Sequence, residues 1–183
     1  MDKTEILLKT IKSIPYCKVI VELGSQFFDI TDERGYTWGC STYHLAKYAT
    51  ENDILFITID IDPTHTDFSI KMLQENKFSG MAINRDGCEA LRELKIFVDF
   101  LYLDTADDPE VSFEQFKVIE PYLTKNSKVA IDDIVNYSTP EYIRMEGKGS
   151  ILLPYCRSKG YKVEKIPAYY KEHYLCDVGI INK

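Results

Sequence analysis

The sequence predicts a doubly wound α/β fold, with a mostly parallel, seven-stranded sheet that ends in an antiparallel hairpin. Short apolar runs alternate with segments of helical periodicity along most of the 183 residues. Such alternation is typical of right-handed crossovers onto a parallel sheet. The last two apolar runs are separated only by AYYK, which is too short for a crossover helix and therefore predicts an antiparallel pair.

Seven apolar runs predict the strands. The first five are apolar at successive positions, which is typical of parallel strands covered on both faces. These five are residues 18–23, 54–60, 80–84, 99–104 and 128–132. Residues 160–167 and 172–183 predict the hairpin.

Segments with apolar residues at helical spacing predict the helices. In 111–123, for example, Val111, Val118 and Tyr122 follow the 3.6-residue period. Helices are predicted at 4–14, 41–49, 65–76, 88–94 and 111–123, with one more near 148–159. We expect a single domain over 1–183, in which the helix of residues 1–14 caps the sheet and residues 25–39 form an inserted loop.

Composition excludes several classes of protein. The net charge is −7 and no basic run exceeds two residues, which argues against a nucleic-acid partner. No apolar run approaches the ~20 residues of a membrane helix, and the charged N-terminus does not resemble a signal peptide. The cysteines number five, are widely spaced and form no C-x-x-C, as in a cytoplasmic protein with reduced thiols. A homodimer remains open.

Polar residues follow every predicted parallel strand. In open α/β sheets, ligands bind at the carboxyl ends of the strands, so these residues predict a ligand site. An acid after one strand is usually a turn former or helix cap, but five such ends favour a site. The ends read Glu22-Leu23-Gly24-Ser25, Asp60-Ile61-Asp62, Asn84-Arg85-Asp86-Gly87, Asp104-Thr105 and Asp132-Asp133.

The ligand predicted for these ends is a nucleoside without phosphates. Gly24 is followed by Ser-Gln-Phe-Phe, so G-x-G-x-x-G is absent, and GYTWGCST lacks the lysine of a phosphate-binding loop. Asp60 ends its strand where a carboxylate can accept hydrogen bonds from ribose hydroxyls.

The motifs that follow one another along the chain are VELGS, GCSTYHLA, ITIDID, RDGCEALREL, DFLYLDT and VAIDD, and the hairpin comes after them. In the order of these motifs, the sequence resembles class I S-adenosylmethionine-dependent methyltransferases. It is similar in particular to metal-dependent O-methyltransferases of the catechol O-methyltransferase type and to the cephalosporin hydroxylase and rhamnosyl O-methyltransferase group. The resemblance implies a Rossmann-like sheet and methylation of a hydroxyl on a small molecule or sugar.

The resemblance also implies the roles of residues that bind S-adenosylmethionine. Glu22, Gly24 and Ser25 would form the first-strand motif, and Ser41 would meet the methionine carboxylate at a helix N-terminus, where anions are favoured. Ser41 is equally suited to a plain helix cap. Asp60 would hold the ribose. The adenine would be bordered by Asp86, Gly87 and Cys88.

The resemblance further implies a divalent metal on Asp104, Asp132 and Asp133. Three carboxylates at one point repel one another unless a cation or outward-turned side chains separate them. Mg²⁺ is the first choice, and Mn²⁺ or Ca²⁺ suits the same oxygen ligands. In the alternative, Asp133 caps a turn and Asp104 binds backbone amides.

Asp107 and Asp104 are the predicted catalytic carboxylates. Related enzymes place a lysine or histidine where this chain has Asp107, so the resemblance is incomplete there. Because an ordinary carboxylate is a weak base at neutral pH, three alternatives stay open. In the first, the metal activates the substrate. In the second, acidic neighbours make Asp107 a better base. In the third, the protein binds the cofactor but catalyses poorly.

A non-catalytic cofactor-binding partner subunit of the same fold is the alternative function, and the missing glycines disfavour a dehydrogenase. The substrate contacts are expected from residues 25–39, 105–110 and 134–149. Trp38, Tyr137 and Tyr142 are the aromatics suited to a ring or sugar. We also expect 25–39 to cover the site as a lid.

Overall fold

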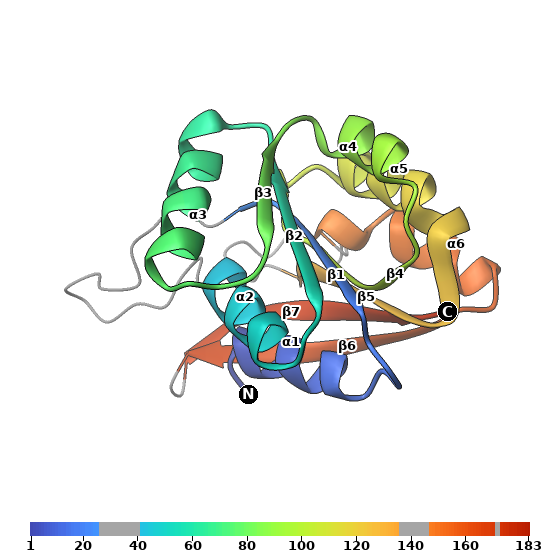
Figure 1. The fold of residues 1–183 in the computed structure, drawn as a ribbon. Coiled ribbons are helices and arrows are strands. Elements are labelled where there is room, and N and C mark those ends of the chain that lie inside the picture. Colours follow the sequence, from blue (N-terminus) through green and yellow to red (C-terminus); the bar gives the residue numbers. More distant parts are fainter. Residues whose placement is uncertain (26–40, 136–146, 171–172) are drawn as a thin grey trace.

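The computed structural model describes residues 1–25, 41–135, 147–170 and 173–183. Its centre is a seven-stranded sheet in the order β3-β2-β1-β4-β5-β7-β6 (Figure 1). The strands from β3 to β5 pair in parallel, and β7 pairs antiparallel with both β5 and β6. This confirms the predicted fold class.

The strands match the predicted apolar runs closely. They are β1 (Val19–Leu23), β2 (Leu55–Asp60), β3 (Met81–Asn84), β4 (Val98–Leu103), β5 (Leu123–Val135), β6 (Lys162–Tyr170) and β7 (His173–Asn182). In the central strand β1, every residue from Ile20 to Leu23 is buried, as expected for a strand covered on both faces.

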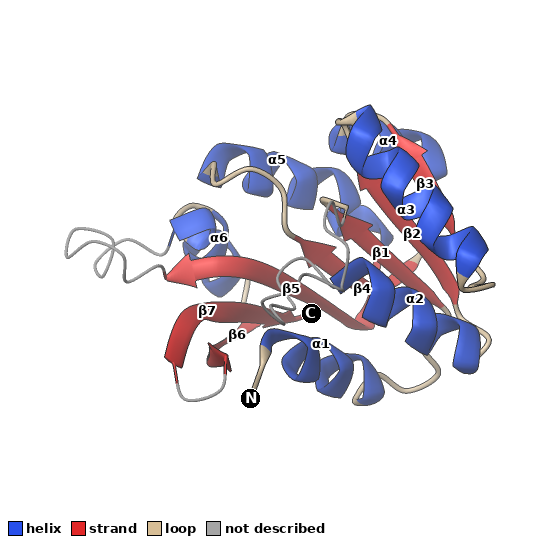
Figure 2. Ribbon diagram, turned by 90° about the vertical axis from the view of Figure 1, so that its left-hand side faces the viewer, coloured by secondary structure: helices blue, strands red, loops and turns tan. Residues whose placement is uncertain are grey.

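Helices cover both faces of the sheet (Figure 2). The helices are α1 (Lys3–Lys12), α2 (Ser41–Glu51), α3 (Pro63–Glu75), α4 (Gly87–Leu94), α5 (Pro109–Ile119) and α6 (Leu152–Ser158), with 3-10 turns η1 (Glu120–Tyr122) and η3 (Gly147–Gly149). α1, α2 and α3 share one core cluster, whereas α4, α5 and α6 share the other. Within the described residues, no helix has the length and apolar character that a membrane crossing requires.

Two element boundaries differ from the prediction around residue 120. The α-helix predicted for 111–123 stops at Ile119, because Pro121 lacks the amide hydrogen that would continue it. β5 then begins at Leu123, five positions before the predicted start, since Leu123 pairs with Val98 ahead of a register shift. The residues between Leu123 and the predicted start are polar, so the sequence pattern does not predict this extension of β5.

The strand order creates the place for a ligand. β1 lies between β2 and β4, so the chain turns outward in opposite directions on the two sides of β1. In open α/β sheets the crevice for a ligand forms at such a switch point, beyond the carboxyl ends of the strands.

Candidate active site

A tight turn after β1 opens the site. Gly24 has φ of +93°, and a Cβ there would lie 2.1 Å from the backbone oxygen of Asp104. Its amide donates to the Ile59 carbonyl at 2.9 Å, while the Asp104 amide donates to the Leu23 carbonyl at 2.8 Å. Only glycine therefore permits this close approach of the turn to the end of β4.

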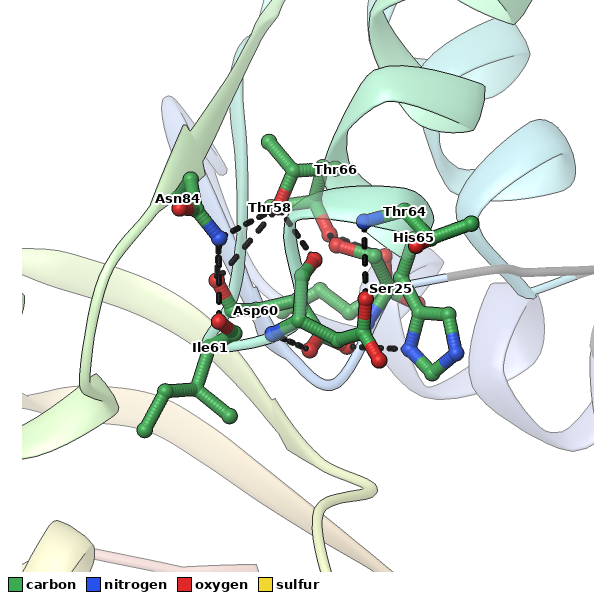
Figure 3. A network of polar contacts seen from close by, with 10 residues as sticks. Ser25, Thr58, Asp60, Ile61, Thr64, His65, Thr66 and Asn84 are labelled. Carbon is green, nitrogen blue, oxygen red and sulfur yellow. Dashed lines mark hydrogen bonds and ion pairs between the residues drawn. The ribbon is translucent and has the colours of Figure 1, made fainter.

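Asp60, the last residue of β2, lies beside this turn in a network of polar contacts (Figure 3). Its Oδ2 accepts from the Ser25 amide at 2.8 Å and lies 3.3 Å from His65 Nδ1. Its Oδ1 accepts from the Asp62 amide at 2.8 Å. The carboxylate is thus held in one orientation by groups on three sides.

Glu22 lies buried beneath the turn. Thr58 donates to its Oε2 at 2.8 Å, and the Thr58 and Ser25 hydroxyls are 3.0 Å apart. Among the described residues, Glu22 Oε1 has no hydrogen-bond partner. Burial raises the pKa of Glu22 to about 7, although the nearby hydroxyls of Ser41, Thr42 and Thr58 act against this rise.

A cavity of about 490 Å³ lies at the carboxyl ends of these strands, within the usual range for small-molecule sites. Ile61 lines it although 71% of this side chain is exposed. An exposed apolar side chain in a cavity wall offers a surface for a flat ring. The lining residues that were predicted from the sequence are Gly24, Ser25, Asp60, Asp86, Gly87 and Asp104.

The start of α4 forms another wall. Asp86 caps the helix by accepting from the Glu89 amide at 3.0 Å, and a Cβ on Gly87 would lie 2.9 Å from Gln115 Nε2. The glycine therefore leaves room for the Gln115 amide, which also lines the cavity. Cys88 is half-buried and is not among the lining residues.

Ser41 is the first residue of α2, so the structure puts it at a helix N-terminus as predicted. It does not line the cavity itself. Its hydroxyl is near enough to Glu22 to lower the pKa of that side chain. The predicted first-strand motif and the head of α2 are therefore in contact range.

The acid that follows β4 is paired with a buried lysine. Lys148 Nζ donates to Asp104 Oδ1 at 3.0 Å and lies 3.4 Å from Asp107 Oδ1. The Tyr102 hydroxyl donates to Asp104 Oδ2 at 3.2 Å. The Lys148 side chain is 4% exposed, whereas that of Asp107 is 81% exposed. Within the group formed by Asp104, Asp107 and Lys148, Asp107 is therefore the side chain that is exposed to solvent.

A second lysine pairs with the acids of β5. Lys3 Nζ lies 2.5 Å from Asp132 Oδ2 and 3.9 Å from Asp133 Oδ1. The thiol of Cys176 is 3.8 Å from Asp132 Oδ1. Asp133 adopts φ of +46°. The three predicted metal acids are therefore gathered at one edge of the sheet, together with two ammonium groups.

The charges of this cluster shift one another. Burial, and then the charge of Asp132, raise the pKa of Asp104 above its ordinary value, although Lys148 and Lys3 oppose this. For Asp132, burial is outweighed by Lys3 and Lys148, which hold its pKa below the usual range. The acids in turn outweigh burial for both lysines and raise their pKa. Both lysines are consequently ammonium cations at neutral pH.

The fit to a divalent cation can be tested on these contacts. Asp132, Asp133 and Cys176 bring one ligand atom each within 4.8 Å of one another. Mg²⁺ and other hard cations prefer oxygen to sulfur, however, so Asp132 and Asp133 are the suitable ligands in this group. Both oxygens of Asp104 and both of Asp132 already face a donor group. Each oxygen keeps a second acceptor site, so it is the two ammonium groups beside the acids that oppose a divalent cation.

Several residues of the site escaped the sequence analysis. They are Lys3, His65, Gln115 and Lys148. Lys148 lies in the irregular stretch 134–149 that was expected to carry function, so the location was indicated although the residue was not. Trp38, Tyr137, Tyr142 and all but the first residue of the predicted lid lie outside the described residues.

No protein-family profile and no curated protein matches the sequence. Solved structures do resemble the fold. A putative O-methyltransferase from Klebsiella pneumoniae has a TM-score of 0.72 and 14% identity, over 98% of this chain and 78% of that chain. The O-methyltransferase TomG from Streptomyces achromogenes, involved in tomaymycin synthesis, was solved with S-adenosylmethionine. It has a TM-score of 0.68 and 16% identity, over 98% of this chain and 78% of that chain.

An rRNA methylase from Streptococcus thermophilus has a TM-score of 0.66 and 10% identity, over 98% of this chain and 94% of that chain. At these identities the comparisons show the fold alone. The chain has the fold of class I S-adenosylmethionine-dependent methyltransferases, as the sequence motifs predicted.

Proposed function

We propose that this chain is an S-adenosylmethionine-dependent methyltransferase that methylates a hydroxyl group. The observation that carries the proposal is the cavity beyond β1, β2 and β4, with the fixed carboxylate of Asp60 in its wall. The shared fold supports it, since TomG binds S-adenosylmethionine on the same fold. When bound, S-adenosylmethionine supplies a methyl group on a sulfonium that a substrate oxygen can attack.

The cavity walls suggest which residues hold the cofactor. Asp60 would accept hydrogen bonds from the ribose hydroxyls, and Ile61 would pack against the adenine ring. Asp86 and Gly87 would border that ring from α4, and Cys88, which follows them, stays a prediction from the sequence because it does not line the cavity. Glu22 and Ser41 do not line the cavity, but we propose that the amino-acid part lies toward them, because a helix N-terminus attracts a carboxylate.

The acid and lysine cluster would prepare the substrate hydroxyl. Asp104 lines the cavity and accepts from the buried Lys148, which does not line it, so a hydroxyl bound to Asp104 would lie near a positive charge. Positive charge near a developing oxyanion stabilises it. Asp107 does not line the cavity, but its exposed carboxylate lies 3.4 Å from Lys148, and we propose that it receives the hydroxyl proton through water.

The sequence predicted Mg²⁺, Mn²⁺ or Ca²⁺ on Asp104, Asp132 and Asp133. A cation there would compete with the ammonium groups of the two lysines for these carboxylates. We assign no step of the reaction to a cation, because Lys3 and Lys148 already donate to these carboxylates.

We propose a small molecule or sugar as the acceptor, rather than RNA. The rRNA methylase has the same fold, so the fold does not decide between them. The net charge of −7 and the acids beside the cavity disfavour a polyanion. A cytoplasmic location and a homodimer stay predictions from the sequence.

Calorimetric titration with S-adenosylhomocysteine tests the cofactor assignment. We expect one molecule to bind per chain and Asp60→Ala to weaken binding by about tenfold or more, as for loss of a charge-assisted hydrogen bond. Asp67→Ala, on the exposed side of α3, is the control and should bind like the wild type. Equal binding by both variants would refute the role of Asp60. Binding without turnover of any hydroxyl acceptor would favour the partner-subunit alternative.

A further inference from the structure

We propose that the ammonium groups of Lys3 and Lys148 take the place of a divalent cation at the carboxyl ends of β4 and β5, so that the chain binds no such cation there. Lys148 pairs with Asp104 and Asp107, and Lys3 pairs with Asp132 and Asp133. Whether the acids bind a cation does not depend on the proposed function. Methyl transfer without a divalent metal, which would follow, rests on that function.

The position of Lys148 is built into the fold. Gly147 has φ of +45°, and a Cβ there would lie 2.4 Å from the backbone oxygen of Asp133. The glycine therefore lets η3 pack directly on the end of β5. The Lys148 side chain that follows it is directed toward the acids. Lys148 is consequently 4% exposed and faces carboxylates rather than water. A lysine so deeply buried persists only with charged partners.

Lys3, near the N-terminus of the chain, is also fixed in position by the structure around it. Asp2 caps α1 by accepting from the Glu5 amide at 2.7 Å, which fixes the first turn that carries Lys3. The buried residues Ile6 and Leu7 anchor the same helix on the sheet. The Lys3 side chain is 26% exposed, so its ammonium group reaches Asp132 from the rim of the cluster.

The donors compete with a metal for the same carboxylates. Asp104 accepts from Lys148 on one oxygen and from the Tyr102 hydroxyl on the other. Asp132 faces Lys3 with one oxygen and the Cys176 thiol with the other. Each of these oxygens has a second acceptor site, so the contacts alone do not exclude a hard cation. A cation there would, however, stand beside two ammonium charges in a partly buried site, where like charges repel strongly.

Binding of Mn²⁺ tests the proposal, because free Mn²⁺ is counted directly by electron paramagnetic resonance without any substrate. With the wild-type chain we expect the signal of free Mn²⁺ to stay at the level of buffer. The double variant Lys3→Met with Lys148→Met keeps the apolar stems and removes both charges. We expect it to bind one Mn²⁺ per chain, and we expect Asp132→Asn added to it to abolish that binding.

Lys9→Met is the matched control, since Lys9 is exposed on the same helix as Lys3. It should bind no Mn²⁺. If the double variant does not fold, as judged by circular dichroism, Lys148→Met alone replaces it.

Stoichiometric binding of Mn²⁺ by the wild type, lost in Asp132→Asn, would overturn the proposal. So would a folded lysine variant that still binds none, because the lysines would then not be what excludes the cation. S-adenosylhomocysteine binding, measured on the same samples, reports on the proposed function separately: its absence refutes that function and leaves the Mn²⁺ result intact.

Discussion

The ammonium nitrogen of Lys148 lies 3.0 Å from Oδ1 of Asp104, and this pair joins the irregular stretch after β5 to the end of β4. The lysine is 4% exposed and the aspartate 27%. Removal of one partner from such a pair leaves the other charge partly buried and uncompensated. The pair therefore supports both the local fold and the charge of the site.

Lys148→Met should lower the free energy of unfolding by roughly 2–3 kcal/mol, less than for a fully buried pair because Asp104 is partly exposed. Urea denaturation monitored by circular dichroism measures this. Lys9→Met, at an exposed position, should change stability by less than about 0.5 kcal/mol. Equal stability of the two variants would mean that the buried pair contributes nothing.

Gly24→Ala should abolish binding of S-adenosylhomocysteine. A Cβ at this position would lie 2.1 Å from the Asp104 carbonyl oxygen, so β1 and β4 would have to separate where the cavity forms. Gly160→Ala is the control, since Gly160 has φ of +81° but nothing within 4 Å of the added Cβ. It should cost only the left-handed strain of about 1–2 kcal/mol and leave binding intact. Equal effects of the two substitutions in calorimetry would contradict the account of the turn.

Ile61→Ser should weaken S-adenosylhomocysteine binding by about tenfold, because the ring would lose an apolar contact worth roughly 1–2 kcal/mol. Stability should change little, since the side chain is 71% exposed without ligand. Ile70→Ser, on α3 and outside the cavity, should bind normally. Unchanged affinity of the Ile61 variant would place the ring elsewhere.

The burial of Glu22 predicts a pH dependence of stability. Its pKa is raised from 4.5 to about 7 in the folded chain, so the folded state binds the proton more tightly than the unfolded state. This contribution is complete below pH 4.5 and is lost as the pH rises to about 7. The loss is on the order of 3 kcal/mol.

Glu22→Gln should remove that loss. Urea unfolding of both proteins across this pH range should show the wild type losing stability relative to the variant as the pH rises. Parallel profiles for the two proteins would show that Glu22 does not titrate in this window.

The fold was largely readable from the sequence, because parallel strands and their helices are local patterns. Buried β1 and the acid at the end of β2 follow from runs of a few residues. The early start of β5 was not readable, because Leu123 joins the sheet through Val98 and the residues after it are polar. Its assignment depends on pairing across the sheet rather than on local composition.

The site was readable in part for the same reason. Gly24, Asp60 and Asp104 lie at or directly after strand ends and were therefore predicted. Lys3 and Lys148 were not, because their carboxylate partners lie 129 and 44 positions away along the chain. No local pattern distinguishes a lysine that will be buried against an acid from one that stays in water.

The most direct test is a crystal structure of the chain grown with S-adenosylhomocysteine and MnCl₂, with an anomalous difference map at the manganese edge. We predict nucleoside density in the cavity, with ribose hydroxyls on the Asp60 carboxylate and Lys148 still on Asp104. We also predict no anomalous peak among Asp104, Asp132 and Asp133. An empty cavity would contradict the proposed function, and a manganese peak at the three acids would contradict the replacement of the metal by lysine.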